Sequence, residues 1–265
     1  MRATRPAALR RFHFWFRMAL FDPIEIARKY RALPHFIRNW RAYRRRNGSA
    51  GFAITWRDLW YRSQDRYDAA GAARGHYFFQ DLWAAKQLFG RGVRAHVDVG
   101  SRMDGFVAHV LTFSNLRYVD IRDSRLQWPG FEFVPGSVTE LPFANGSVAS
   151  LSCLHVLEHI GLGRYGDPVD PEGYLAGARE LARVLAPGGV LLVGTPVGRE
   201  RLCFDAHRVF DPQTVRHAFA ELTLDSFALI DDSGDGIVDD AQFVRARQCE
   251  YGCGLFVFSK KATTA

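Results

Sequence analysis

The apolar positions of the chain change their spacing from one part of the chain to the next. Over residues 23–46 and again over 75–89 they recur every three or four residues, which is typical of an amphipathic helix. From residue 96 onward, short apolar runs alternate with stretches of helical spacing. Because parallel strands need helical crossovers between them, this alternation predicts an α/β domain with a mostly parallel sheet and helices on both faces.

Seven apolar runs bounded by Gly, Pro, Asp or Ser predict the strands, at 96–99, 116–121, 131–134, 148–154, 190–194, 222–230 and 255–259. Helices are expected at 10–21, 23–46, 75–89, 106–113 and 172–185. We expect the 75–89 helix to cover the edge of the sheet. We expect Asp170 to cap the last helix and Pro187-Gly188-Gly189 to end it. The predicted fold is Rossmann-like, preceded by a basic helical N-terminal extension.

Charge divides the chain at the same place as the pattern. Residues 1–46 hold thirteen Lys or Arg and two acids, a net charge of +11, whereas the remainder holds 22 basic and 26 acidic residues, a net charge of −4. The stretch 47–51 combines glycines with small polar residues and reads as a linker. We therefore predict an arm over residues 1–50 and one Rossmann-like domain over 51–265, with the boundary at the linker or within the thirty residues after it.

Aromatic and aliphatic side chains interleave with the arginines of the arm, and this pattern leaves two interpretations open. Basic aromatic helices lie on anionic membrane surfaces, so residues 1–46 are a candidate for membrane binding. Alternatively, the arm packs on the body with its arginines in water. The run Arg44 to Arg46 resembles a phosphate footprint, but it lacks a base-reading module, so no nucleic-acid partner is expected.

The four cysteines contain no C-x-x-C pair and lie in or beside apolar segments, as reduced core thiols do. No apolar run reaches the roughly 18 residues that would span a bilayer, and the apolar stretch 12–21 lacks the features of a signal peptide. We expect a cytoplasmic protein that is peripheral on the inner face of the membrane if the arm binds lipid.

Candidate ligand-binding residues follow the predicted strands, at the edge where such sheets bind ligands. Asp98-Val99-Gly100-Ser101 follows the first strand, with glycine again at Gly105. Asp120 ends the second strand, 22 residues after Asp98, where a carboxylate can accept hydrogen bonds from both hydroxyls of a ribose. The first turn lacks the three-glycine phosphate loop, which tells against a dinucleotide.

These residues resemble class I S-adenosylmethionine-dependent methyltransferases, most strongly from Val134 to Gly198. The resemblance lies in Leu141-Pro142-Phe143, in Leu154 to His159 and in Arg183 to Gly189. The pattern departs from the family's D-x-G-x-G-x-G at Arg102 and Asp104, and the usual acid after the third strand is Ser137. The resemblance implies S-adenosyl-L-methionine as cofactor. The residues implied to bind it are Asp98, Gly100, Ser101, Gly105, Asp120, Ile121, Ser137, Val138, Leu154 and His155.

A narrower resemblance covers about residues 75–230. The segments 76–81, 96–106, 154–171 and 206–208 look like the family called domain of unknown function 268. Its name leaves the reaction open, so this resemblance implies the fold and the cofactor.

The same region carries a second possible motif. His155-Val-Leu-Glu158-His159 reads as H-x-x-E-H, in which two His of one helix bind zinc and Glu serves as base. The alternative is that His155 and Glu158 line the cofactor pocket and His159 begins the acceptor wall. We prefer this alternative and expect no metal ligands, with a zinc hydrolase as a distant possibility.

Polar residues for the acceptor side follow the fourth and fifth strands. His159, Asp167, His207 and Arg208 are the candidates, with His207 a possible general base. The expected reaction is O-methylation of a sugar or envelope glycan precursor, so the partner is a small-molecule or glycan acceptor. The competing hypothesis is a non-catalytic Rossmann-like protein that binds a ligand or a partner, which Arg102 and Asp104 favour because they replace glycines.

Overall fold

The computed structural model describes residues 23–47, 55–61 and 73–262. The chain divides into two compact units, residues 1–72 and 73–265. The division lies 22 residues beyond the position predicted for it and within the thirty residues that follow the 47–51 stretch. The expected helix at 10–21 and most of that linker lie outside the described residues.

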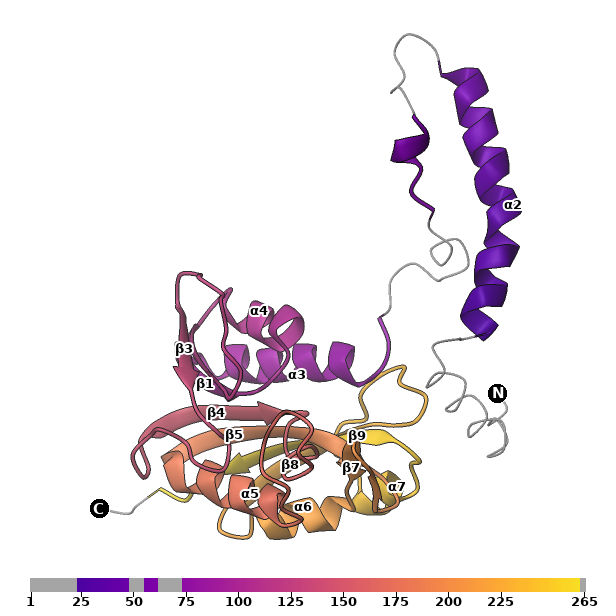
Figure 1. Ribbon diagram of the computed structural model, residues 1–265. Helices are drawn as coiled ribbons and strands as arrows, with labels where there is room; N and C mark the ends of the chain where they lie inside the picture. Colours follow the sequence, from indigo (N-terminus) through magenta and orange to yellow (C-terminus); the bar gives the residue numbers. More distant parts are fainter. Residues whose placement is uncertain (1–22, 48–54, 62–72, 263–265) are drawn as a thin grey trace. The chain divides into compact units, whose positions relative to one another are not determined.

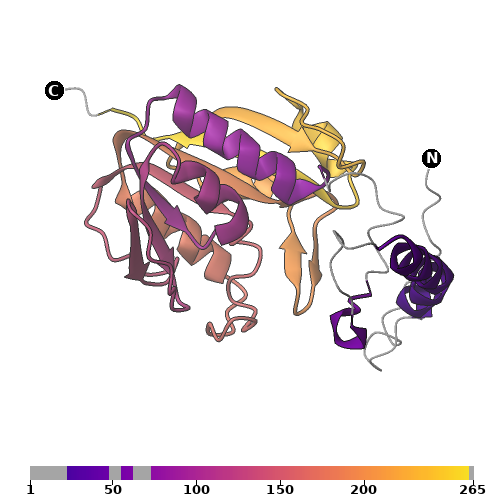
Figure 2. The same ribbon diagram turned by 90° about the horizontal axis from the view of Figure 1, so that it is seen from above.

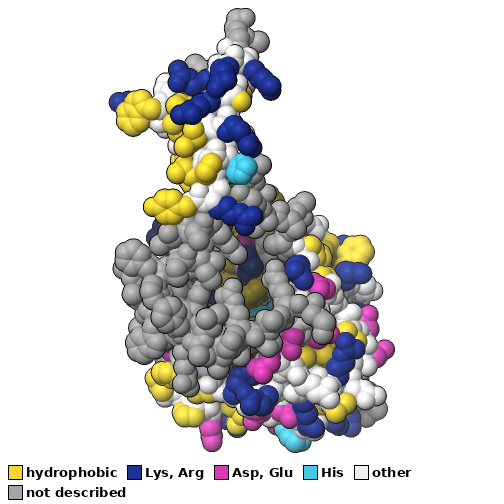
Figure 3. Space-filling model, turned by 90° about the vertical axis from the view of Figure 1, so that its right-hand side faces the viewer, with side chains coloured by type: hydrophobic (Ala, Val, Ile, Leu, Met, Phe, Trp, Pro, Cys, Tyr) yellow, Lys and Arg dark blue, Asp and Glu magenta, His cyan; other side chains and the backbone are white. Residues whose placement is uncertain are grey.

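The first unit contains the long helix α2 (Pro23–Arg46), which has the predicted bounds, and the short 3₁₀ helix η1 (Trp56–Asp58). Basic side chains gather on α2 with hydrophobic side chains between them (Figure 3). Tyr30 and Tyr43 are exposed, and Arg44 to Arg46 form the last turn, where positive charge is favourable. Within the described residues, no helix is long and apolar enough to cross a membrane.

The second unit is built on a seven-stranded sheet in the order β3-β2-β1-β4-β5-β9-β8 (Figure 1). The register shows parallel pairing from β3 through β5, while β9 runs antiparallel to both β5 and β8. The strands are β1 (Ala95–Val99), β2 (Asn115–Asp120), β3 (Phe131–Pro135), β4 (Val148–Leu154), β5 (Leu185–Val197), β8 (Thr223–Ile230) and β9 (Gly252–Ser259). The mostly parallel sheet expected from the sequence is confirmed.

Helices cover both faces of this sheet. On one side lie α3 (His76–Gly90), the single-turn π-helix η2 (Met103–Val107) and α4 (Ala108–Val110), and on the other lie α5 (Gly173–Val184), α6 (Pro212–Ala218) and α7 (Phe243–Arg247) (Figure 1). A small hairpin of β6 (Arg201–Cys203) and β7 (His207–Val209) follows β5.

Alternation along the strands builds two cores. In β4, Leu151 and Cys153 face the core under α5, whereas Leu154 joins the core under α3. In β9, Phe256 and Phe258 face the first core, whereas Leu255 and Val257 face the second. Strands buried on both faces by helices read as nearly continuous apolar runs, which explains why these segments were recognisable from the sequence.

Several details differ from the sequence expectations. Pro187-Gly188-Gly189 does not end the helix, because α5 ends at Val184 and these residues lie within β5. The helix α3 does not cover an edge: Trp83 and Leu88 pack in one cluster with residues of β2, β4, β5 and β9, and Figure 2 shows α3 lying over the sheet. The single helix expected at 106–113 is the π-turn η2 followed by the short α4. Asp170 is not the cap of α5, because Glu172 holds that position; Asp170 instead accepts the Glu172 backbone N–H at 2.9 Å.

Candidate functional site

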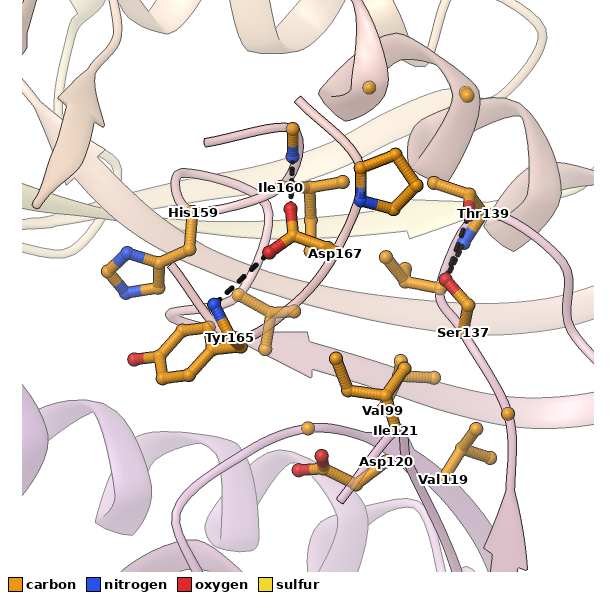
Figure 4. A pocket seen from close by; sticks show the side chains of 18 of the residues that line it. Val99, Val119, Asp120, Ile121, Ser137, Thr139, His159, Ile160, Tyr165 and Asp167 are labelled. Atoms are coloured by element: carbon orange, nitrogen blue, oxygen red, sulfur yellow. Dashed lines mark hydrogen bonds between the residues drawn. The ribbon is translucent and has the colours of Figure 1, made fainter. Parts of the chain in front are cut away.

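A pocket opens beyond the carboxyl ends of β1 to β4, where the parallel strands of the sheet bring their loops together (Figure 4). Gly100, Asp120 and Ser137 line it from the loops after the first three strands, and His155 from the loop after the fourth. In Figure 4, His159 and Tyr165 stand on one side, Ser137 and Thr139 on the other, and Asp120 and Ile121 below. This is the place at which open α/β sheets bind ligands.

Asp98 supports this pocket from behind without lining it. Its side chain is fully buried and accepts the Ser101 backbone N–H at 3.0 Å, the Ser101 hydroxyl at 2.6 Å and the Ser152 hydroxyl. Burial raises the pKa of Asp98 to about 6, against the lowering effect of these hydrogen bonds. Asp98 therefore fixes the turn at residues 99–101, and Ser101 turns inward toward it.

Gly100 and Gly105 are close to different parts of the structure, Gly100 at the pocket and Gly105 against α3. Gly100 lines the pocket at φ +68°, and a Cβ there would lie 3.1 Å from the Val156 side chain. Gly105 lies in η2, away from the pocket residues, and a Cβ there would lie 2.0 Å from Oδ2 of Asp81. The glycine of η2 is thus explained by its packing against α3.

Arg102 and Asp104, which stand where glycines are expected, bind each other. Their side chains form a two-point ion pair with distances of 2.5 and 2.8 Å, and both are exposed. The Arg102 guanidinium also lies 5.2 Å from the centre of the Tyr77 ring. Neither residue lines the pocket, so the side chains that replace the expected glycines are not part of its wall.

Asp120 is one of the carboxylates that line the pocket. Its oxygens accept hydrogen bonds from Nε of Arg122 at 3.0 Å, from Nη2 of Arg122 at 2.7 Å and from the Tyr118 hydroxyl at 3.0 Å. Burial raises the pKa of Asp120, but the hydrogen bonds from Arg122 outweigh it and the pKa lies below its usual value. The Arg122 guanidinium also lies 4.8 Å from the ring centre of Tyr165. Asp120 is therefore ionised and held by a side chain that is itself at the surface.

The loop after β3 provides smaller polar groups. Ser137 and Thr139 share a hydrogen bond of 2.8 Å between their hydroxyls, and both line the pocket. Val138 and Ile121 contribute apolar surface, Val138 from a buried position and Ile121 from an exposed one. An apolar wall with a few placed polar groups is the usual lining of a small-molecule site.

The loop after β4 begins with a buried charged pair. His155 has a left-handed backbone at φ +55° and donates its Nδ1 hydrogen to Glu158 at 2.6 Å. Burial lowers the pKa of His155, but the negative charge of Glu158 and the other interactions of the ring raise it by more. The pKa of His155 therefore lies well above its usual value. Leu154 is buried beside this turn, where its N–H donates to Ser101 at 3.2 Å, and it does not line the pocket.

The H-x-x-E-H reading requires a helix that the structure does not have. Residues 155–160 form turns, and the His159 ring donates Nδ1–H to the Ala206 carbonyl at 2.7 Å. His155 and His159 therefore do not face one another across a helical turn, and the proposed zinc hydrolase motif is wrong in this respect.

His159 and Asp167 also line the pocket. Nε2 of His159 lies 3.8 Å from the Glu158 carboxylate, and burial, the largest effect, lowers the pKa of His159. Asp167 accepts the backbone N–H groups of Gly161 at 2.7 Å and Tyr165 at 3.2 Å. Asp167 thus shapes the loop as well as lining the pocket.

His207 and Arg208 lie on β7 and do not line this pocket. The His207 ring lies 5.0 Å from that of Tyr251. Arg208 donates to the carbonyls of Ile160 at 2.6 Å and Pro171 at 3.2 Å, and its backbone N–H donates to Glu158. Arg208 therefore holds the loop 158–171 in place from outside, and its role as an acceptor residue stays a prediction.

Sequence reasoning missed several pocket residues, among them Arg122, Thr139 and Tyr165. Arg122 carried a usable signal, because a residue two positions after an Asp often donates its backbone N–H to that carboxylate, as Arg122 does at 2.9 Å. Tyr165 lies in a glycine-rich loop whose path depends on Arg208 and Asp167, and no local pattern reveals it.

Comparison with known proteins gives a family match over about a third of the chain. The model of the family described as Caenorhabditis protein of unknown function, DUF268, matches residues 144–234. No curated protein matches the chain.

Solved structures are similar over a larger part. The cyclase SpnF is 14% identical with a TM-score of 0.51, covering 69% of this chain and 81% of its own. A putative sarcosine dimethylglycine methyltransferase from Galdieria sulphuraria is 16% identical with a TM-score of 0.50, covering 68% of this chain and 85% of its own. At such identities the likeness shows the fold alone. The chain has the Rossmann-like fold of class I S-adenosylmethionine-dependent methyltransferases, and over residues 144–234 it is similar to the DUF268 family.

Proposed function

We propose that this protein is an S-adenosylmethionine-dependent methyltransferase. The observation that carries the proposal is the ionised Asp120 carboxylate at the end of β2, beside Gly100 in the same pocket. A carboxylate at this place can accept hydrogen bonds from both ribose hydroxyls. The apolar surfaces of Ile121 and Val138 would contact the adenine, and the hydroxyls of Ser137 and Thr139 offer it hydrogen bonds.

The cofactor would supply an electrophilic methyl group, and the acceptor end of the pocket offers a base. Because the Ala206 carbonyl takes the Nδ1 hydrogen of His159, neutral His159 has its lone pair on Nε2. Its lowered pKa keeps the ring neutral near pH 7, and the nearby Glu158 carboxylate would stabilise the imidazolium after proton transfer. This arrangement suits methylation of a hydroxyl, and a sugar or glycan precursor is the acceptor that we propose.

A second candidate function is binding without methyl transfer. The ion pair between Asp120 and Arg122 favours it, because Arg122 occupies the oxygens that ribose would use. The fold does not decide between the two, since SpnF, a solved structure of similar fold, is named as a cyclase.

Calorimetric titration with S-adenosylmethionine and S-adenosylhomocysteine tests the proposal. We expect micromolar binding by the full chain and at least about 100-fold weaker binding by Asp120→Ala, because two charge-assisted hydrogen bonds of about 1.5–3 kcal/mol each would be lost. Asp123→Ala, which removes an exposed acid three residues away, is the matched control. No binding by the folded full chain, or equal binding by Asp120→Ala, would refute the assignment.

We also propose that the arm carries the enzyme to an anionic membrane surface on the cytoplasmic side. The observation in support is the combination on α2 of exposed aromatic rings, Tyr30 and Tyr43, with the basic residues Arg44 to Arg46. Aromatic rings enter the headgroup region while arginines pair with lipid phosphates, so the two kinds of side chain act together. An acceptor attached to an envelope lipid would then be within reach of the enzyme.

A further inference from the structure

Beside the cofactor pocket, three side chains that bind soft metal ions converge on one point. His76 lies at the start of α3, His155 follows β4, and Cys253 lies near the start of the antiparallel strand β9. One potential ligand atom from each lies within 4.8 Å of the other two. We propose that these three residues bind a zinc ion and leave its fourth position open.

The separation of the best-placed pair fits a shared ion. Nε2 of His155 and Sγ of Cys253 are 3.6 Å apart. Zinc holds sulfur at about 2.3 Å and nitrogen at about 2.0 Å, and at a tetrahedral angle these bonds place the two atoms about 3.5 Å apart. A thiol hydrogen bond to the imidazole would explain this one distance equally well, but it would not require His76.

Both histidines have one ring nitrogen already engaged by an acceptor, as metal-bound histidines do. Nδ1 of His155 donates to the Glu158 carboxylate at 2.6 Å, which turns Nε2 toward Cys253. Nε2 of His76 donates to the Tyr251 carbonyl at 3.1 Å, which leaves Nδ1 for the ion. The carboxylate, histidine and metal would form the sequence found around many zinc sites.

Charge and burial also agree with a divalent cation. Cys253 is fully buried, His155 is nearly so, and Glu158 is 1% exposed. Zinc binding would release the Cys253 thiol proton and the second ring proton of the His155 imidazolium. The ion would then replace the imidazolium charge beside Glu158 and balance the two negative charges of the Glu158 carboxylate and the Cys253 thiolate. His155 is held there in a left-handed conformation that non-glycine residues rarely adopt, and such conformations concentrate at functional positions.

The open position would face the half-buried side of the cluster, where His76 and the exposed Tyr77 and Tyr251 lie. Three protein ligands and one free position are the arrangement of catalytic rather than structural zinc. The site is distinct from the H-x-x-E-H motif, because it uses His155 alone of those residues as a ligand. Since His155 also lines the cofactor pocket, an oxygen bound to the ion would lie next to that pocket.

Cobalt substitution tests this site without any knowledge of the reaction. The full chain, dialysed against a chelator, would be titrated with Co²⁺ and then with Zn²⁺. We expect one equivalent of Co²⁺ to give visible bands of a tetrahedral ion together with a thiolate-to-cobalt charge-transfer band, and Zn²⁺ to remove both. Circular dichroism of each protein establishes that it is folded.

Variants assign the ligands. We expect Cys253→Ser to abolish the charge-transfer band and His76→Asn to weaken Co²⁺ binding by more than 100-fold, whereas Cys249→Ser, which changes another buried cysteine, should behave as the wild type. Glu158→Gln should weaken binding by about 10- to 100-fold. His76 is only half-buried, so its variant is informative even if Cys253→Ser unfolds.

Three outcomes would overturn the proposal: no Co²⁺ bands in the folded full chain, unchanged bands in Cys253→Ser, or unchanged affinity in His76→Asn. The first would leave the cluster as a hydrogen-bonded thiol and imidazole pair. None of these measurements involves S-adenosylmethionine, so failure here is distinguishable from failure of the proposed methyltransferase function.

Discussion

Arg122 forms a bidentate ion pair with the carboxylate of Asp120, with Nε 3.0 Å from one oxygen and Nη2 2.7 Å from the other. A ribose bound to Asp120 must displace at least part of this ion pair. The Arg122 side chain is 57% exposed, so the pair contributes less than about 1 kcal/mol. The guanidinium is therefore a weak competitor for the cofactor site rather than a barrier to it.

Removal of this competitor should tighten cofactor binding. We expect Arg122→Ala to bind S-adenosylhomocysteine about threefold more tightly than the wild type, which corresponds to about 0.6 kcal/mol. Wild-type affinity should also rise with salt, because salt weakens the exposed pair. Calorimetry at two salt concentrations measures both effects, with Arg125→Ala as control in the same loop. A loss of affinity in Arg122→Ala would instead mean that Arg122 contacts the cofactor.

His96 and Asp98 are both buried and both hydrogen-bond to the Ser152 hydroxyl, and together they predict an unusual dependence of stability on pH. Burial lowers the pKa of His96 to about 3, so its contribution is complete above about 6.5 and is lost as the pH falls through 3. Burial raises the pKa of Asp98 to about 6, so its contribution is complete below about 3.8 and is lost as the pH rises through 6. Between about pH 4 and 6 the two contributions have opposite slopes and cancel.

Replacement of one partner should expose the contribution of the other. Relative to the wild type, His96→Asn should lose about 2 kcal/mol of unfolding free energy as the pH rises from 4 to 6, because only the Asp98 contribution then remains. Urea unfolding at pH 4, 5 and 6 measures this difference. The contributions of titratable groups that both proteins share cancel when the two unfolding free energies are subtracted. His109→Asn, at an exposed position, should follow the wild type. Parallel profiles for His96→Asn and wild type would contradict the assignment.

Gly105 was predicted to bind the cofactor, and its packing against Asp81 gives a different expectation. Gly105→Ala should destabilise the protein by about 1–3 kcal/mol, because its Cβ would overlap the buried Asp81 carboxylate. Thermal unfolding measures this, with Gly90→Ala as control, since a Cβ at residue 90 meets nothing within 4 Å. The folded variant should bind S-adenosylhomocysteine as the wild type does. If Gly105→Ala had the stability of the wild type but had lost affinity for S-adenosylhomocysteine, Gly105 would be part of the cofactor site.

These cases show what local patterns could and could not predict. The strand β4 has its predicted bounds because a strand buried on both faces is apolar throughout. Asp120 was placed at the pocket because chain order alone puts the end of β2 at the ligand-binding edge. Gly105 was predicted at the cofactor site, whereas the structure packs it against Asp81, a contact that only the folded chain brings about. The cluster of His76, His155 and Cys253 joins three distant segments and has no signature in sequence spacing.

The contacts of Arg208 lead us to expect that its replacement destabilises one loop, residues 158–171. Its guanidinium binds the carbonyls of Ile160 and Pro171, and it lies 5.3 Å from the ring centre of Tyr174. Lysine cannot reach two carbonyls in this fork geometry, so Arg208→Lys should lose about 1–3 kcal/mol of unfolding free energy. Hydrogen exchange should show the loss of protection within residues 158–171. Arg179→Lys on the exposed face of α5 is the control, and equal stability of the two variants would show that the clamp contributes nothing.

The arm gives the last prediction, on membrane binding. Deletion of residues 1–48 removes the +11 charge of the arm and leaves a body of net charge −4, which an anionic surface repels. The full chain should therefore sediment with vesicles that contain phosphatidylglycerol, and the truncated chain should stay in the supernatant. Neutral phosphatidylcholine vesicles are the lipid control, and binding to the anionic vesicles should fall steeply with salt because arginine contributes about 1 kcal/mol per residue near such a surface. Equal sedimentation of the truncated chain would place any membrane contact on residues 49–265, and salt-independent binding would assign it to the aromatic residues rather than to the arginines.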